Sequence, residues 1–217
     1  MTVSVVLVTY RRLTRIGEIA QAWLAQTPDV WLCDCSRRGA KTGIAALKTV
    51  RAWPDPGNKI RHAVAMMTQG DLVIKADDDV MPRPGLVQDF VSHATMYGPA
   101  IYGIHGRIFR RPDYYHGTQL FGAKSVRQAQ PVDFVGVVTC SSREYLGMDL
   151  RDCRTEVEDL YWQMQCYPKA KKYVIVTDKF MHLSESKDKG RLCGTPESRL
   201  VRSQYYQFWY NRNYAAR

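Results

Sequence analysis

The chain has 217 residues, 45% of them hydrophobic, and a formal net charge of +10 at pH 7. This length and composition suit one domain with its own core and exclude a largely disordered chain. No stretch is apolar for long enough to span a bilayer, and the first residues enter an apolar run without a basic leader, so we expect a soluble, cytoplasmic protein. The positive charge favours polyanionic partners such as nucleic acid.

Strands and helices alternate in the first part of the chain. The valine-rich run at 3–8 predicts a central parallel strand covered on both faces, and apolar residues repeat at helical spacing over 16–24. Residues 30–33 predict a second strand, which ends at Asp34. A strand, a helix and a strand in this order form a βαβ unit, so the sheet is expected to be parallel.

Two more helices are predicted before the next strand, over 44–53 and 60–67, with a Pro-Asp-Pro-Gly break between them. The apolar face of the second helix is expected to consist of Ile60, Ala63, Val64 and Met67.

A short apolar strand at 72–74 leads into three consecutive acids at 77–79, and two prolines follow. Adjacent carboxylates repel one another, so the fold must supply a cation, for which a divalent metal ion is the leading candidate. A solvated acidic turn is the alternative. Because ligands bind at the carboxyl ends of strands in open α/β sheets, Tyr10, Asp34 and the acids are expected to meet around a nucleotide.

The predicted elements of the second half are a helix from Pro84, a strand over 99–104, a hairpin or loop over 106–130, a strand over 132–140, a helix from 155 and a strand over 173–177. Thr155 and Glu158 have capping-box spacing, which puts Asp159 in the first turn of its helix. The buried stripe of that helix is expected to consist of Val157, Leu160, Tyr161 and Met164.

The six cysteines are expected to be reduced thiols. Cys33 and Cys35 alternate along a predicted strand and therefore point to opposite faces, which makes them a poor pair of zinc ligands. The others, Cys140, Cys153, Cys166 and Cys193, are widely spread along the sequence.

Over residues 3–183 the chain resembles inverting GT-A glycosyltransferases of family 2. The matching pieces are Thr9-Tyr10-Arg11-Arg12, Asp34, Asp77-Asp78-Asp79, Gly136 with Ser141-Ser142-Arg143-Glu144, Glu158-Asp159 and His182. The resemblance implies a Rossmann-like α/β fold, with a mixed, mainly parallel sheet flanked by helices in a single domain. It implies a nucleotide-binding half at 1–104 and an acceptor-side half at 105–183, followed by a basic aromatic tail or helix at 184–217.

The resemblance also implies a UDP-sugar donor and a set of donor-binding residues. These residues are Thr9, Tyr10, Arg12, Asp34, Arg61, Asp77 and Asp78. Among them, Asp34 would accept hydrogen bonds from the base. The implied cofactor is Mn²⁺ or Mg²⁺, bound by Asp79 with Asp77 and His182, and whether Asp78 or Asp79 is the main ligand stays open.

Glu158 and Asp159 are the implied catalytic pair, with Asp159 as the base. An inverting transfer needs a carboxylate that takes the proton of the acceptor hydroxyl, and a divalent ion neutralises the charge that grows on the leaving diphosphate. Considered alone, acids in this position are also typical of an ordinary helix amino terminus, and His182 of a hydrogen-bonded core histidine.

The acceptor surface is expected from 106–130 and the tail, because both are basic and aromatic and the chain has little room for a separate acceptor domain. Aromatic rings beside cations suit single-stranded or flipped bases. The leading hypothesis is a bacteriophage-type enzyme that places a sugar on a hydroxymethylated pyrimidine in DNA, in the host cytoplasm if the protein is viral.

Three alternatives stay open. One is transfer to a saccharide or a lipid-linked glycan at a membrane surface, with the tail as an interfacial anchor. Another is a nucleic-acid-binding protein without catalysis. A nucleotidyltransferase ranks last, because no glycine-rich phosphate loop follows the first strand.

Overall fold

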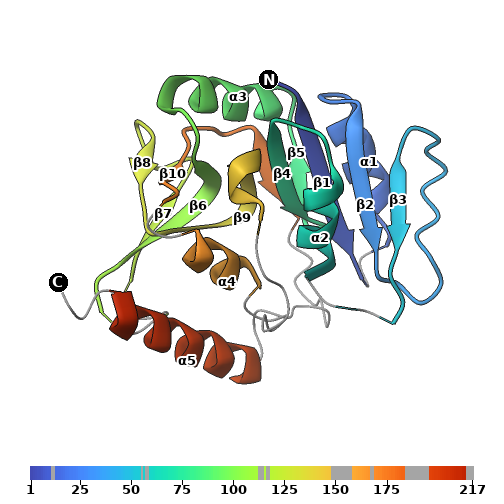
Figure 1. Ribbon diagram of the computed structural model, residues 1–217. Coiled ribbons are helices and arrows are strands. Elements are labelled where there is room, and N and C mark those ends of the chain that lie inside the picture. Colours follow the sequence, from blue (N-terminus) through green and yellow to red (C-terminus); the bar gives the residue numbers. More distant parts are fainter. Residues whose placement is uncertain are drawn as a thin grey trace.

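The computed structural model describes residues 1–10, 13–54, 56, 59–111, 115, 118–147, 158–166, 169–183 and 196–213. Within them, nine strands form one sheet in the order β3-β2-β1-β4-β9-β6-β10-β8, with β7 beside β6 (Figure 1). Their bounds are β1 Val3–Thr9, β2 Asp29–Asp34, β3 Lys48–Arg51, β4 Leu72–Asp77, β6 Ile101–Phe109, β7 Thr118–Gly122, β8 Gln130–Pro131, β9 Phe134–Ser142 and β10 Lys172–Val174. The predicted mixed, mainly parallel sheet is confirmed.

The central strand β1 is parallel to both of its neighbours, β2 and β4, and is buried on both faces. Val5 and Leu7 pack in one core cluster with α1 (Ile16–Leu24) and α3 (Leu86–Tyr97), whereas Val6 packs in another with α2 (Lys59–Met67). Alternate side chains of one strand therefore fill two layers. This burial on both sides explains the continuous valine-rich sequence of β1.

The other half of the sheet is mixed. β9 runs antiparallel to both β4 and β6, and β6 forms a hairpin with β7, which confirms the hairpin expected between residues 106 and 130. The ladder between β6 and β9 shifts register between Gly103 and His105. Opposite this irregularity, Val137 has a φ of 71°, a backbone conformation that is uncommon for a β-branched residue.

The remaining elements surround the sheet. β5 (Val80–Pro82) pairs antiparallel with β11 (Phe180–His182) in a separate two-stranded sheet. A short 3₁₀ helix, η1 (Arg143–Tyr145), follows β9. Helices α4 (Glu158–Gln165) and α5 (Pro196–Asn213) lie together below the sheet in Figure 1. Tyr206 of α5 is fully buried in a cluster with Phe109 of β6 and Leu160 of α4, so α5 packs on the rest of the fold.

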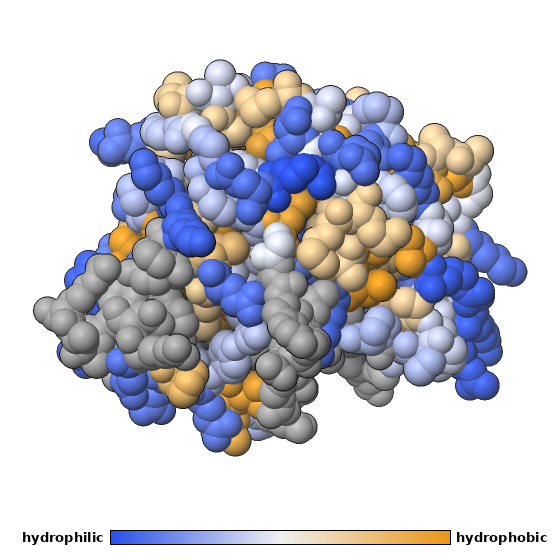
Figure 2. Space-filling view, in the orientation of Figure 1, coloured by the Kyte–Doolittle hydropathy of each residue, from blue (hydrophilic) through white to orange (hydrophobic). Residues whose placement is uncertain are grey.

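Two sequence predictions about the first half are wrong. The helix expected over 44–53 is replaced by β3, which pairs parallel with β2; the β-branched residues Thr49 and Val50 favour this strand. The inner face of α2 consists of Arg61, His62, Val64 and Ala65. Met67, expected inside, is 59% exposed, and hydrophobic residues gather on the surface over α2 in Figure 2.

The last predicted strand is shorter than expected, because β10 ends at Val174. The chain then leaves the sheet and binds α3. The hydroxyl of Thr177 donates to Asp89 Oδ2 at 2.6 Å, and Lys179 Nζ donates to Asp89 Oδ1 at 2.7 Å. A side-chain contact with a helix thus replaces continued strand pairing.

Four cysteines lie in the described part of the chain: Cys33, Cys35, Cys140 and Cys166 are buried free thiols. Burial raises the pKa of Cys33 to about 12, so its thiol stays protonated at neutral pH. Cys153 and Cys193 lie outside the described residues. No helix in the described segments is both long and apolar enough to cross a membrane.

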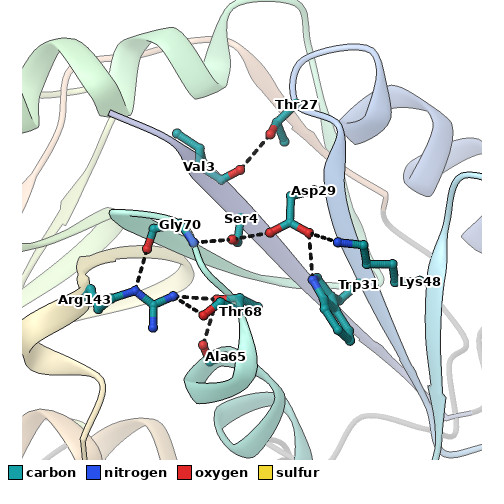
Figure 3. Close-up of polar contacts among 10 residues, drawn as sticks. All are labelled: Val3, Ser4, Thr27, Asp29, Trp31, Lys48, Ala65, Thr68, Gly70 and Arg143. Carbon is teal, nitrogen blue, oxygen red and sulfur yellow. Dashed lines mark hydrogen bonds and ion pairs between the residues drawn. The ribbon is translucent and has the colours of Figure 1, made fainter.

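A polar network joins the amino-terminal ends of the parallel strands (Figure 3). Asp29 accepts hydrogen bonds from Ser4 Oγ at 2.5 Å, Trp31 Nε1 at 2.9 Å and Lys48 Nζ at 2.7 Å. Ser4 Oγ in turn accepts from Gly70 N at 2.9 Å. β1, β2, β3 and the turn before β4 are therefore held together by interacting side chains as well as by strand pairing.

Gly70 is enclosed in this network. Its carbonyl accepts from Arg143 Nε at 2.9 Å, and a Cβ at this position would lie 2.5 Å from Ser4 N and 2.7 Å from Leu72 O. Both close atoms belong to the backbone, so a larger side chain displaces the turn.

We predict that Gly70→Ala lowers the free energy of unfolding by about 1–3 kcal/mol, the usual cost of overpacking a closed site. Denaturant unfolding monitored by circular dichroism measures the change. Gly147→Ala is the matched control, because a Cβ there meets no atom within 4 Å. Equal stability of the two variants would contradict the tight enclosure of Gly70.

Candidate active site

Three parallel strands end at one edge of the sheet. Thr9 at the end of β1 is in register with Asp34 at the end of β2, and Val8 is in register with Asp77 at the end of β4. These ends point toward the side on which α4 and α5 lie (Figure 1). The expected convergence of the first two strand ends with the acidic turn is confirmed.

The three consecutive acids take different surroundings. Asp77 is the last residue of β4, and its Oδ1 accepts from Arg61 Nη1 at 2.5 Å. Asp78 Oδ2 accepts from the Thr9 hydroxyl at 2.9 Å. Asp79 precedes β5, and its carbonyl accepts from Leu183 N at 2.8 Å. Arg61 thus already compensates part of the negative charge for which a metal ion was expected.

Asp34 shapes its own loop. Its side chain is 1% exposed; Oδ1 accepts from Ser36 N at 3.0 Å and Ser36 Oγ at 2.6 Å, and Oδ2 accepts from Ala40 N at 2.6 Å. Burial alone would raise the pKa of Asp34, but these hydrogen bonds offset it, so the pKa lies below its ordinary value. The Asp34 carboxylate therefore fixes the conformation of the loop after β2. Its contact with a nucleotide base stays a prediction.

A buried polar cluster lies behind the acidic strand. His62 Nε2 lies 2.6 Å from Leu146 O, and because a carbonyl only accepts, Nε2 carries the proton. His62 Nδ1 then accepts from Lys75 Nζ at 3.0 Å. Burial, assisted by the charge of Lys75, lowers the pKa of His62 to about 2, so the imidazole is neutral. Lys75 Nζ also lies 3.2 Å from the ring centroid of Trp162 in α4, a cation–π contact.

Two side chains fix helix α4, one to η1 and the other to β9 of the sheet. Trp162 Nε1 donates to Tyr145 O at 2.6 Å. Gln163 accepts from Val135 N at 2.9 Å and donates to Val135 O at 2.6 Å, as a neighbouring strand would. Trp162 and Gln163 are buried, whereas Tyr161 and Met164 are only half-buried. The predicted stripe is therefore correct for Leu160 but misses the residues that fix the helix, and Val157 lies outside the described residues.

Asp159 stands one turn before Gln163, and its carboxylate meets Arg202 of α5. Arg202 Nη2 lies 2.8 Å from Oδ2 and 3.0 Å from Oδ1. Burial would raise the pKa of Asp159, but the charges of Arg202 and Arg61 hold it below its ordinary value. Because Arg61 also pairs with Asp77, it links Asp159 electrostatically to the acidic turn.

Asp79 directly precedes β5, and His182 lies in β11, where it is paired with Val80, the residue after Asp79. The ring of His105 lies 5.4 Å from that of His182, measured between centroids. His105 Nδ1 is buried and has no hydrogen-bond partner in the described part of the chain. Burial, followed by the effect of His182, lowers the pKa of His105.

No group of three or more His, Cys, Asp or Glu side chains that could hold a metal ion by itself occurs among the described residues. A divalent ion at a diphosphate, however, uses one or two protein carboxylates and takes its other ligands from phosphate and water. Asp79 before β5 and His182 in the paired strand β11 supply residue types that are compatible with such an open site.

Not every predicted piece lies at this edge. β9 is antiparallel to β4 and pairs Ser142 with Leu72, so residues 141–144 lie at the opposite, amino-terminal edge of β4. Arg143 is there hydrogen-bonded to Thr68 and Gly70. Arg12 and the side chain of Glu158 lie outside the described residues, and Tyr10 is half-buried at the end of β1.

The sequence pattern does not indicate that His62 and Lys75 belong to the site, and it does not connect Arg202 with Asp159. For Arg202 a signal exists: Val201, Arg202, Tyr205 and Tyr206 lie at helical spacing on one face of α5. For His62 and Lys75 the sequence offers no comparable signal, because each is a polar residue whose buried partner comes from another element.

No known family model and no curated protein matches the chain. Solved structures of S. aureus TarS are similar. Residues 1–349 of TarS in complex with UDP-GlcNAc superpose with a TM-score of 0.67 at 15% identity, over 97% of this chain and 67% of that one. A further structure of TarS 1–349 superposes with a TM-score of 0.61 at 14% identity, over 100% of this chain and 73% of that one. TarS 1–349 in complex with UDP superposes with a TM-score of 0.59 at 18% identity, over 83% of this chain and 59% of that one. The predicted GT-A fold is thereby confirmed.

We predict that Asp34→Asn lowers the free energy of unfolding at pH 7 by about 1–3 kcal/mol, because the amide NH₂ faces a backbone donor that it cannot satisfy. The folded pKa of Asp34 is below the ordinary value of 3.8. Its stabilisation is therefore present above that value and is lost as the pH falls through the folded pKa. The difference between the proteins should shrink below about pH 4.

Urea unfolding at pH 7 and pH 3 measures both effects. Asp178→Asn, at an exposed position, is the control and should change stability little at either pH. A difference in unfolding free energy between the wild type and Asp34→Asn that stays constant with pH would contradict the assigned contacts of Asp34.

Proposed function

We propose that this protein is a metal-dependent inverting glycosyltransferase that transfers a sugar from a UDP-sugar to a hydroxyl group. The observation that carries the proposal is the link through Arg61, which pairs with Asp77 of the acidic turn and acts electrostatically on Asp159 of α4. A donor site and a general base need this proximity, because the acceptor must attack the sugar while the diphosphate is held.

The donor side is supported by the strand ends and by the likeness to TarS, whose structures hold UDP-GlcNAc and UDP. We assign Thr9, Tyr10, Arg12, Asp34, Arg61, Asp77 and Asp78 to the donor side. Arg61 and Asp77 form a charged pair beside the site, while Thr9 and Asp78 join the ends of β1 and β4. Asp34 contributes by holding the loop after β2.

Asp79 and His182 would hold the divalent ion, with Asp77 beside them. When bound, Mn²⁺ or Mg²⁺ would neutralise the charge of the leaving diphosphate. A carboxylate combined with an imidazole favours Mn²⁺ over Mg²⁺, because Mg²⁺ prefers an all-oxygen shell.

Asp159 would take the proton of the acceptor hydroxyl, with Glu158 beside it. Two cations keep Asp159 ionised at neutral pH, which is the state that accepts a proton. Its attachment to the sheet through Gln163 keeps the base at a fixed place.

For the acceptor we propose DNA that carries a hydroxymethylated pyrimidine. The net charge of +10 and the exposed basic residues on and after the β6–β7 hairpin support a polyanionic acceptor. These residues are Arg110, Arg111, Lys124 and Arg127. The aromatic residues of α5 support it less than the sequence suggested, because Tyr206 is buried and Tyr205 and Tyr210 are half-buried.

We predict that UDP-GlcNAc with Mn²⁺ raises the melting temperature, since a ligand at 100 times its Kd stabilises the native state by about 2.7 kcal/mol. Asp79→Asn should abolish the part of the shift that depends on Mn²⁺. A thermal melt with UDP-GlcNAc, UDP and ADP, each with and without the metal, measures this. Glu18→Gln, at an exposed residue of α1, is the control. Equal shifts with UDP and ADP would contradict a uridine site.

We predict that Asp159→Asn lowers kcat by about 10²–10⁴-fold, the usual contribution of a general base, while the shift caused by UDP-GlcNAc is retained. Sugar transfer to hydroxymethylated duplex and single-stranded DNA is measured by mass spectrometry of the nucleosides. Unmodified DNA and soluble glycans serve as other acceptors. Transfer to glycans alone would overturn the DNA acceptor, and no transfer to any acceptor with UDP-sugars would overturn the proposed activity.

A further inference from the structure

Arg202 is a buried cation whose contact lies at the candidate active site. Its side chain is 7% exposed, and a single guanidinium nitrogen bridges both carboxylate oxygens of Asp159, at 2.8 and 3.0 Å. A buried guanidinium is stable only when paired, and a carboxylate held at both oxygens has a fixed orientation. The contact therefore determines how the carboxylate of Asp159 points.

The packing of α5 explains why Arg202 stays in this place. Tyr206, one turn along the same face, is fully buried, and its ring centroid lies 4.4 Å from that of Phe109 in β6. The Tyr206 hydroxyl donates to Arg111 O at 3.1 Å. Tyr205 packs against Tyr161 of α4, with 5.5 Å between the ring centroids. The helix is thus anchored on both β6 and α4 beside the ion pair.

We propose that Arg202 is a positioning residue for Asp159, so that helix α5 completes the catalytic centre and is not merely an appended acceptor-binding tail. The proposal rests on the proposed function, in which Asp159 is the general base. Arg202 would act by fixing the orientation of the carboxylate and by keeping it ionised in a partly buried place.

The electrostatic surroundings of Asp159 support this role. Arg202 approaches from α5 and Arg61 acts from α2; on its own helix, Leu160 N donates to Asp159 Oδ1 at 2.9 Å. Strand β9 contacts α4 through the main chain of Val135, which carries no charge. The charged side chain of Lys75 in β4 lies over the ring of Trp162, almost one helical turn after Asp159. Burial raises the pKa of Asp159, and without Arg202 this effect would be opposed chiefly by the charge of Arg61. The pKa of Asp159 would therefore rise.

The test compares Arg202→Met and Arg202→Lys with the wild-type chain. For the Met variant we expect the acid limb of the pH profile of kcat/KM to move up by about one to three pH units, the usual effect of losing a close opposite charge. We also expect kcat to fall at pH 6, with partial recovery at pH 8. The Lys variant keeps the charge but not the bridge, so its acid limb should stay near that of the wild type while kcat falls.

Gln204→Met is the control, at an exposed position of the same helix, and should leave the profile unchanged. Titration of the Asp159 carboxyl carbon by ¹³C NMR gives a readout without turnover, in which Arg202→Met should raise its pKa. A wild-type acid limb and an unchanged carboxyl titration in Arg202→Met would overturn the proposal.

Three further outcomes separate the hypotheses. If Arg202→Met were faster than the wild type at every pH, Arg202 would block the base instead of positioning it, and the proposal would be overturned. If the wild type transferred no sugar while the carboxyl titration shifted in Arg202→Met, the proposed function would fail, and with it the catalytic role of Arg202, although the ion pair would stand. Loss of the UDP-GlcNAc-induced melting shift in both variants would indicate a purely structural role and contradict the proposal.

Discussion

The need to compensate negative charge at the end of a buried strand organises the candidate active-site edge of this protein. β4 carries an apolar strand into three adjacent acids, which are only half-buried but repel one another at the edge of a packed sheet. Arg61 meets Asp77, Thr9 meets Asp78, and the electrostatic effect of Arg61 extends to Asp159, which Arg202 holds from the far side. Acids and arginines alternate across four elements, so the position of each depends on its neighbours.

Much of this edge could be predicted because it follows from backbone periodicity. Apolar runs that stop at Thr9, Asp34 and Asp77 mark three strand ends, and parallel pairing leaves the register little freedom. The sequence also located Asp159 in the first turn of its helix. What it could not predict was which polar residues point inward. Arg61 and His62 interrupt the apolar pattern of α2, and only their partners in β4 and η1 make burial favourable.

The same limitation explains the other errors. Gln163 appears polar in sequence, yet it replaces a strand partner for Val135 and is buried for that reason. The segment at 48–51 appears helical by its mixture of charged and apolar residues, yet Lys48 reaches Asp29 and the backbone adds an edge strand to β2. In each case a single hydrogen-bonded partner, distant in sequence, decides between two local structures of similar intrinsic preference. The network around Asp29 shows that this happens at the edge away from the site as well.

The tail shows how composition alone can mislead. Arginine and tyrosine in alternation suit a surface that binds nucleic acid, but the same residues at helical spacing also suit a helix that buries one face. The two arrangements differ in what each arginine requires. An exposed arginine needs only water, whereas a buried one needs a carboxylate within hydrogen-bond distance. Arg202 is buried and has that carboxylate in Asp159, so the stability of α5 on the fold and the charge state of the candidate base are thermodynamically linked. A boundary drawn at residue 183 would separate two halves of one ion pair.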